Sequence, residues 1–459
     1  MKRKLVTCLT STLLPFAVFS SGHLHASQTS NAPVAYHQHA SIKKYLAEST
    51  SKPLETDSNA SIKFDALKAV SSGSYEDFKK SIQPLIAKMS TKRIVALGEG
   101  THGTAEFYKL RYWISRILIE EKGFNHIAFE NDYSDGWYIT KGLNGKADLN
   151  TLMKKHLLSI WQNEETKELL TWVREYNGKH GKKVVIDGLD YVMLTRDVEL
   201  LRETLGKKGS TEMRSQLEKL AAAAALQDEA WNGMNIKGYK IDYKQLHASS
   251  RNGYLFADTL KSKINELGIE ASGKIASQKA LTNLMQGFAP FYEVTAEATR
   301  DSLMAVNVSM ILEDTEDKMI IWAHNAHVAK TGIYNNAVGG TGGHILKLFP
   351  NNYYVLGTGT ATGTFAATTD PRDTYTNPMN AYPLENPIKG SWEEMLSSSN
   401  KPVVYFDPAA FNTEKLIKPL RFIGFSPKSG PSTFDKTNIS DLFDGFIFIK
   451  DSSAATPLK

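Results

Sequence analysis

Short apolar runs alternate with amphipathic stretches along most of the chain. The first run, KRIVALG at 92–98, precedes apolar residues that recur at helical spacing from Phe107 to Leu118. NHIAFE at 125–130 and KVVIDGLD at 183–190 repeat the strand pattern. Short apolar strands separated by amphipathic helices are typical of a parallel sheet with helices packed on its faces. The pattern therefore predicts an α/β fold with a mostly parallel central sheet flanked by helices.

The pattern changes in the middle of the chain. From about Arg196 to Asp314 no run resembles a strand, and EKLAAAAALQDEAW at 218–231 has strong helix propensity. Strand-like runs return later, at 319–323, 353–357, 402–406 and 445–449. We therefore expect an α/β core in two parts, residues 61–195 and 315–459, interrupted by an all-helical subdomain at 196–314.

The first 26 residues have the composition of a targeting segment. Three basic residues, Lys2, Arg3 and Lys4, precede an apolar stretch from Leu5 to Phe19, and small residues lead to Ala26. This order is typical of a secretory signal peptide, and the apolar stretch is too short for a bilayer-spanning helix. We expect a signal peptide at 1–26, cleaved near Ala26, and a mobile leader at 27–60. The mature protein is then periplasmic or secreted, with no membrane attachment.

Composition excludes several classes of protein. Hydrophobic residues make up 41% and charged residues 22% of the chain, as in an ordinary globular protein. Removing residues 1–26, which hold three basic residues and no acid, lowers the formal net charge from +5 to +2. That charge does not indicate a nucleic-acid partner. The only cysteine, Cys8, lies in the signal segment, so the mature chain has no disulfide or catalytic cysteine. The oligomeric state stays open.

Polar clusters follow three of the predicted strands. Glu99 and His102 lie in GEGTHG at 98–103, Glu130 ends the second strand, and His324 and His327 follow the strand after the helical subdomain. Ligands of open α/β sheets bind beyond the carboxyl ends of the strands. We therefore expect these acids and histidines to share one site.

Glu99 and His102 suit general-base chemistry. His102 lies just before a predicted helix, whose positive N-terminal end disfavours the imidazolium form. A neutral imidazole can accept a proton near physiological pH, and Glu99 can orient it or hold a water. The alternative is a structural glycine turn with a capping histidine. The P-loop and GxSxG signatures are both absent, so a phosphate loop and a serine nucleophile lack support.

The other candidates allow more than one interpretation. Glu130 closes an apolar strand, so its carboxylate is desolvated with a raised pKa, paired with a cation, or simply a strand-end acid. Arg111 faces either the carboxylates or solvent. His324 and His327 have HxxH spacing, which with nearby acids can hold a metal, although HExxH is absent. His344 is a weaker candidate.

Several motifs in order resemble the erythromycin esterase (macrolide esterase) family: GEGTHG, WQNEETKELL, DGLDY, RDSLMAVNV, IIWAHNAHVAK and GTATGTF. The resemblance implies an α/β core, an inserted helical subdomain and a deep cleft. It also implies hydrolysis of a macrocyclic lactone by activated water, without a cofactor or covalent intermediate. By this resemblance, His102 matches the essential histidine of the family, and Glu99 and Glu130 match its two carboxylates. Arg111 matches the family's site arginine, and His324 matches its second histidine, which comes late in the sequence.

We therefore predict a metal-independent hydrolase of an ester or lactone. His102, assisted by Glu99, deprotonates water, while Arg111 and His324 stabilise the oxyanion or protonate the leaving alkoxide and Glu130 tunes them. Two alternatives stay open. One is a metallohydrolase with Glu99, His102, Glu130 and His324 as ligands, and the other is an exported binding protein for iron, haem or a glycan.

A large apolar substrate also needs an apolar wall. Pro290 should break a helix of the subdomain and gather aromatic side chains at the bend. We expect Phe288 or Phe291 to line the cleft there, with His327 and His344 as further substrate-binding residues.

Overall fold

The structure, a computed structural model, describes residues 66–205, 209–233, 236–292, 299–333, 340–410 and 416–459. The predicted signal peptide and leader lie outside the described residues. No helix in the described ranges is long and apolar enough to cross a membrane.

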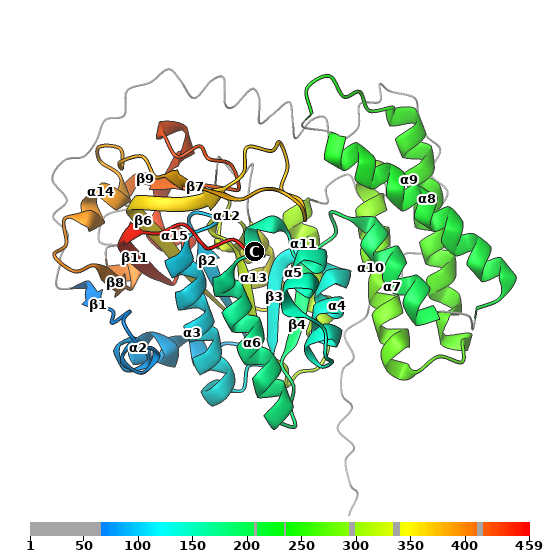
Figure 1. Ribbon diagram of the computed structural model, residues 1–459, viewed down its shortest axis with the longest axis horizontal. Helices are drawn as coiled ribbons and strands as arrows, with labels where there is room; N and C mark the ends of the chain where they lie inside the picture. Colours follow the sequence, from blue (N-terminus) through cyan, green and yellow to red (C-terminus); the bar gives the residue numbers. More distant parts are fainter. Residues whose placement is uncertain (1–65, 206–208, 234–235, 293–298, 334–339, 411–415) are drawn as a thin grey trace, which may run out of the picture. The chain divides into compact units, whose positions relative to one another are not determined.

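Nine strands of the described chain form one sheet in the order β1-β8-β11-β6-β2-β5-β3-β4, with β7 beside β6 (Figure 1). Neighbours from β11 to β4 are parallel, whereas β1, β7 and β8 pair antiparallel. The predicted mostly parallel sheet is thus confirmed. Its strands are β1 (Lys68–Ala69), β2 (Ile94–Glu99), β3 (His126–Asp132), β4 (Val185–Asp190), β5 (Met319–His324), β6 (Tyr353–Ala367), β7 (Asn380–Pro383), β8 (Val403–Phe406) and β11 (Gly445–Ser452). A separate antiparallel pair joins β9 (Ile417–Arg421) and β10 (Phe434–Asn438).

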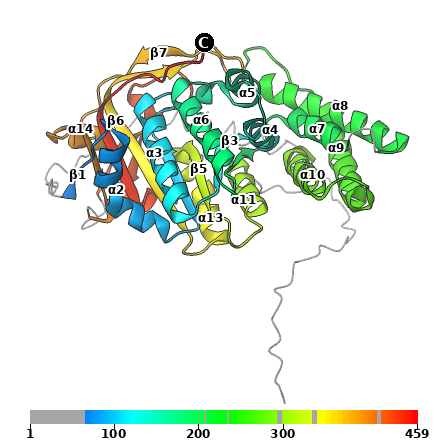
Figure 2. The same cartoon turned by 60° about the horizontal axis from the view of Figure 1, so that its bottom comes forward.

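Helices cover both faces of the sheet (Figure 2). All six residues of β2 are buried, because a parallel strand covered on both faces has no solvent-facing side. Val95 and Leu97 belong to one core, and Ile94 and Ala96 to the other. The first core includes side chains of α2 (Tyr75–Ser90), α3 (Ala105–Lys122), α5 (Leu149–His156), the 3₁₀ turn η2 (Ser159–Trp161) and α6 (Glu164–Lys179).

The second core holds most of the remaining helices. They are α7 (Leu194–Leu205), α8 (Thr211–Gly233), α9 (Tyr243–Lys263), η4 (Ile264–Glu266), α10 (Ala271–Tyr292), α11 (Arg300–Ile311), α12 (Asn325–Val328), α13 (Thr341–Leu348), α14 (Trp392–Ser397) and α15 (Ile439–Leu442). Side chains of α4 (Tyr133–Leu143) enter both cores. The short turn η6 (Pro431–Thr433) leads into β10.

The described part of 196–314 contains helices and no strand. α8 and α10 both pack on α9, while α11 contacts β4 and α13. The predicted helix break at Pro290 is wrong, because α10 continues to Tyr292. The proline falls in the last turn of the helix, where it removes a backbone hydrogen bond near the end rather than in the middle.

Candidate active site

Glu99, at the carboxyl end of β2, lies between the His102 imidazole and the Arg111 guanidinium. Its Oε1 is 2.6 Å from Nδ1 of His102, and its Oε2 accepts a hydrogen bond of 2.8 Å from the Arg111 guanidinium. Glu99 is fully buried, and His102 and Arg111 are 6% and 1% exposed. The guanidinium carbon also lies 4.6–5.2 Å from the ring centres of Tyr108, Trp161 and Trp322. Arg111 therefore faces the carboxylate and not solvent.

The glycine turn after β2 places His102. Gly103 has a φ of +74°, and a side chain there would come within 2.0 Å of the Ala366 carbonyl oxygen, so the position requires glycine. His102 N–H donates to the Ile423 carbonyl at 3.1 Å. Thr104 is the N-cap of α3, as its sequence position suggests, but its hydroxyl makes no capping bond.

The pKa of His102 shifts in the direction opposite to the one that its sequence position predicts. A helix N-terminus disfavours the imidazolium, yet the pKa of His102 is raised. Burial opposes this shift, but the Glu99 carboxylate outweighs burial through its charge and its hydrogen bond. Because Nδ1 contacts the carboxylate, Nε2 is the nitrogen that can exchange a proton with a water or substrate.

Glu130, on β3, is paired with cations. Its Oε1 is 3.1 Å from the Arg300 guanidinium and 3.2 Å from Nε2 of His327, and its Oε2 accepts the His324 N–H at 3.0 Å. Burial alone would raise the pKa of Glu130, but His327 and Arg300 hold it well below the usual range. Of the predicted alternatives, pairing with cations is the one observed, so Glu130 stays ionised.

His327 and Arg300 complete this charged network. His327 Nδ1 is 2.8 Å from an Asp301 carboxylate oxygen. Burial disfavours its imidazolium, but Glu130 and Asp301 raise the pKa of His327 to about 10. Arg300 Nε donates to Asp190 at 2.9 Å. Carboxylates and cations thus alternate along the carboxyl ends of β2, β3, β4 and β5.

His324 lies beside His102, with 4.9 Å between the ring centres. Its Nε2 is 3.1 Å from the Ile423 carbonyl oxygen, and its Nδ1 accepts the Ala326 N–H at 3.2 Å. Burial and the neighbouring His102 lower the pKa of His324 to about 3, so the ring is neutral. Both nitrogens are bonded to backbone, so this geometry does not present His324 as a proton donor to a substrate.

The structure does not bring every candidate to this cluster. His344 is half-buried on α13 and makes no hydrogen bond or ion pair with the charged network among the described residues. Phe288 is fully buried, and its ring packs against Gly253 of α9. Phe291, near the end of α10, is half-buried.

The two carboxylates of the candidate metal site already contact other groups of the protein. In the described parts of the chain, no group of three or more His, Cys, Asp or Glu side chains has the arrangement of a metal site. Glu99 and Glu130 each contact a guanidinium instead.

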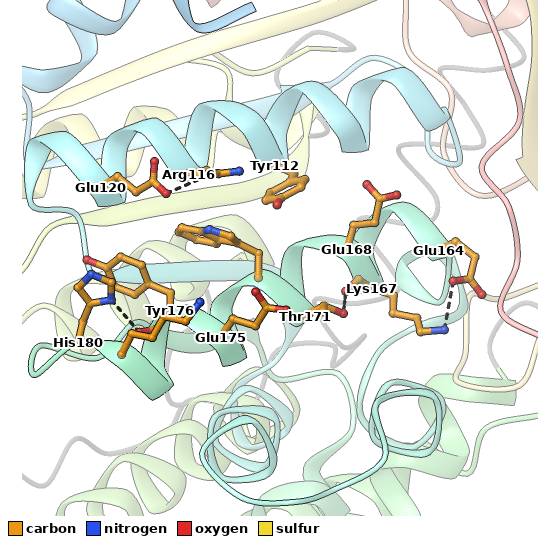
Figure 3. Close-up of a pocket in the computed structure, with 12 residues that line it drawn as sticks. Tyr112, Arg116, Glu120, Glu164, Lys167, Glu168, Thr171, Glu175, Tyr176 and His180 are labelled. Carbon is orange, nitrogen blue, oxygen red and sulfur yellow. Dashed lines mark hydrogen bonds and ion pairs between the residues drawn. The ribbon is translucent and has the colours of Figure 1, made fainter. Parts of the chain in front are cut away.

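A separate groove lies between α3 and α6 (Figure 3), with a volume of about 560 Å³. Across it, Arg116 and Glu120 of α3 face Tyr176 of α6 and His180, which caps that helix. None of the predicted site residues lines it. It is therefore distinct from the charged cluster.

Three residues of the network escaped the prediction from sequence. Asp190 ends β4 inside DGLDY, and Arg300 and Asp301 open α11 inside RDSLMAVNV. The strand-end position of Asp190 was a usable signal, because it matches that of Glu99. Arg300 and Asp301 lie at the start of a helix, where charged residues are common, so their position alone does not indicate a role in the site.

Comparisons with known proteins identify the family and the fold of this chain. The erythromycin esterase family model matches residues 119–452. Erythromycin esterase type II of Escherichia coli is 26% identical over 418 residues, covering 83% of this chain and 94% of that protein. Two solved structures share the fold at 18% identity. A Bacillus cereus protein has a TM-score of 0.69, covering 86% of this chain and 97% of its own. A mutant of the erythromycin esterase EreC, in an open conformation, has a TM-score of 0.61, covering 83% and 95%. The chain therefore belongs to the erythromycin esterase family.

Proposed function

We propose that the protein is an exported carboxylic ester hydrolase that opens a macrocyclic lactone with water activated by His102. The observation that carries the proposal is the buried Glu99–His102 pair. A carboxylate on Nδ1 fixes the tautomer of the imidazole and leaves Nε2 to take a proton from water.

The surrounding charges suit an ester reaction. When water adds to the ester carbonyl, negative charge develops on the carbonyl oxygen and needs a nearby cation. Arg300 has a side chain that is 30% exposed at the strand ends, whereas Arg111 is buried behind Glu99. We assign oxyanion stabilisation to Arg300 and the positioning of Glu99 to Arg111. Both nitrogens of His327 already contact carboxylates, so His327 serves to position Glu130.

The substrate class follows from the relatives. Two relatives from Escherichia coli are named erythromycin esterase type II and type I. We therefore propose a macrolide lactone as the substrate. Purified protein is incubated with a panel of macrolides and smaller lactones, and products are read by mass spectrometry. A gain of one water molecule, with turnover, is expected. Tight binding without any turnover would favour the binding-protein alternative.

A second measurement addresses the metal-dependent alternative. The carboxylates of Glu99 and Glu130 already contact arginines, so we expect activity to survive exhaustive chelation. Activity that disappears on chelation and returns with Zn²⁺ or Mn²⁺ would contradict metal-independent hydrolysis and support a metallohydrolase.

A further inference from the structure

The segment between β6 and β7 is tied to the carboxyl end of the sheet. The Thr374 carbonyl accepts hydrogen bonds from the N–H and the hydroxyl of Ser159, at 2.8 and 2.7 Å. The Tyr375 hydroxyl lies 2.6 Å from an Asp132 carboxylate oxygen and 2.5 Å from one of Asp135. These contacts fix the backbone on the C-terminal side of Asp373.

Asp373 is a half-buried residue of this segment. Its Oδ1 is shielded from solvent and has no hydrogen-bond partner among the described residues. A buried polar atom without a partner costs about 1–3 kcal/mol, and a catalytic role or a bound group is one physical reason for keeping such an atom. The unpaired oxygen of Asp373 therefore marks a position that a substrate group can fill.

The charged groups around Asp373 are those of the active site. It interacts electrostatically with His102 after β2, Glu130 on β3, Arg300 on α11 and its chain neighbour Arg372. Burial raises the pKa of Asp373 to about 7, although His102 opposes the shift. A carboxyl group with this pKa is partly protonated at neutral pH and can donate its proton.

Other groups of the site do not offer a proton in the same way. Glu130 stays ionised, because His327 and Arg300 hold its pKa well below the usual range. The N–H of the neutral His324 imidazole is directed to the Ile423 carbonyl. Asp132 also has a pKa raised to about 7, by burial and by Asp190, but Tyr375 and the Met193 N–H already contact its oxygens.

We propose that Asp373 is the general acid of this hydrolase, an inference that rests on the proposed function. Water loses a proton to Nε2 of His102 as its oxygen bonds to the ester carbon. The tetrahedral intermediate then collapses, the bond from carbon to the alcohol oxygen breaks, and that oxygen takes the proton of Asp373. Transfer of the proton from His102 to Asp373, directly or through solvent, restores the starting state. The net reaction consumes one water and yields an acid and an alcohol.

Leaving-group dependence tests this role. The probes are a macrolide lactone, whose alkoxide needs protonation, and p-nitrophenyl acetate, whose p-nitrophenolate leaves without it. Asp373→Asn should lower kcat on the lactone by at least ~100-fold, the usual scale for a general acid, and change the aryl ester little. Asp370→Asn is the matched control in the same segment, where Asp370 accepts a hydrogen bond of 2.7 Å from Asn377. It should affect both esters by the same factor.

The pH profile gives a second readout that needs no variant. With the wild-type protein, kcat on the lactone should fall as the pH rises through about 7, the pKa of Asp373. Hydrolysis of p-nitrophenyl acetate should show no such fall.

The outcomes separate the inference from the proposed function. If the wild-type protein cleaves no ester, the proposed function fails and the inference falls with it. If it cleaves the lactone, equal losses on both esters in Asp373→Asn, or full activity, overturn the role of Asp373. Should that variant not fold, or the aryl ester not be a substrate, a lactone profile that stays flat above pH 7 overturns it.

Discussion

The negative charge of Glu99 acts on two neighbouring groups, the His102 imidazole and the Arg111 guanidinium. It raises the pKa of His102 and neutralises the Arg111 guanidinium, whose surroundings are three aromatic rings. A buried cation without its carboxylate is far more costly than an intact pair. Activity and stability are therefore coupled at this residue.

Glu99→Gln should separate the two effects. The variant removes the negative charge, so the free energy of unfolding should fall by roughly 3–5 kcal/mol, the usual cost of breaking a buried pair. Adding Arg111→Met replaces the unpaired cation by an apolar side chain, and should recover most of the stability but not the activity. Urea unfolding and kcat measure the two quantities. A Glu99→Gln protein as stable as wild type would contradict the pairing.

The pH dependence of activity reports the charge on His102. The pKa of His102 lies above its ordinary 6.5, because Glu99 outweighs burial. A general base must be neutral, so kcat on p-nitrophenyl acetate, whose leaving group needs no proton from Asp373, should rise with pH with a midpoint above 6.5. The contribution of His102 to the free energy of unfolding depends on pH in the opposite direction. It is complete below the pKa of His102 in the unfolded chain and is lost as the pH rises through the higher pKa of His102 in the folded protein. A kinetic midpoint at or below 6.5 would contradict the account.

Some site residues could be predicted from sequence because their positions are tied to strand ends. Glu99, Glu130 and His324 each lie at or near the end of a short apolar run, and parallel strands bring those ends together. The choice of partners could not be predicted. Arg300 reaches Glu130 across 170 residues of sequence, and only the packed fold decides which cation meets which carboxylate.

At the scale of elements, the parallel strands were predictable and the helical subdomain only in outline. Buried strands are apolar on both faces and stand out from the sequence. The role of a single aromatic side chain in a helix cannot be recognised from the sequence, because the same aromatic residues occur in cores and in clefts. Phe288 shows this difference, since its buried ring packs on Gly253 of the neighbouring helix α9.

Phe288→Ala should therefore act on stability. Removing a fully buried ring lowers the free energy of unfolding by about 3–5 kcal/mol, and KM should stay unchanged. Phe291→Ala, at a half-buried position of the same helix, is the matched control and should cost less. Thermal unfolding and steady-state kinetics distinguish the two. A raised KM with normal stability in Phe288→Ala would place that ring in the cleft.

For the whole molecule, the convergence of strands explains why distant segments form one site. Glu99, Glu130, Asp190 and His324 belong to four neighbouring strands of the sheet, which share one carboxyl edge. Arg300 and Asp301 reach that edge from the start of α11, which packs against β4. The fold therefore needs every segment from β2 to β5 to assemble the charged network.

The N-terminal segment carries a prediction about the whole chain. Its basic, apolar and small-residue order predicts cleavage after Ala26. N-terminal sequencing of protein from cells that express the full chain should begin at Ser27, in material outside the cytoplasm. An intact Met1 on cytoplasmic protein would refute export.

The most direct test of the account compares turnover of a macrolide lactone by wild type, His102→Asn and His180→Asn. His180 is exposed at the end of α6 and lines the groove between α3 and α6, which contains none of the predicted site residues. Its variant therefore controls for the loss of a histidine outside the site. We predict that His102→Asn folds normally and loses at least ~100-fold in kcat, while His180→Asn keeps wild-type activity. A His102→Asn protein with near-wild-type kcat would contradict activation of water by His102.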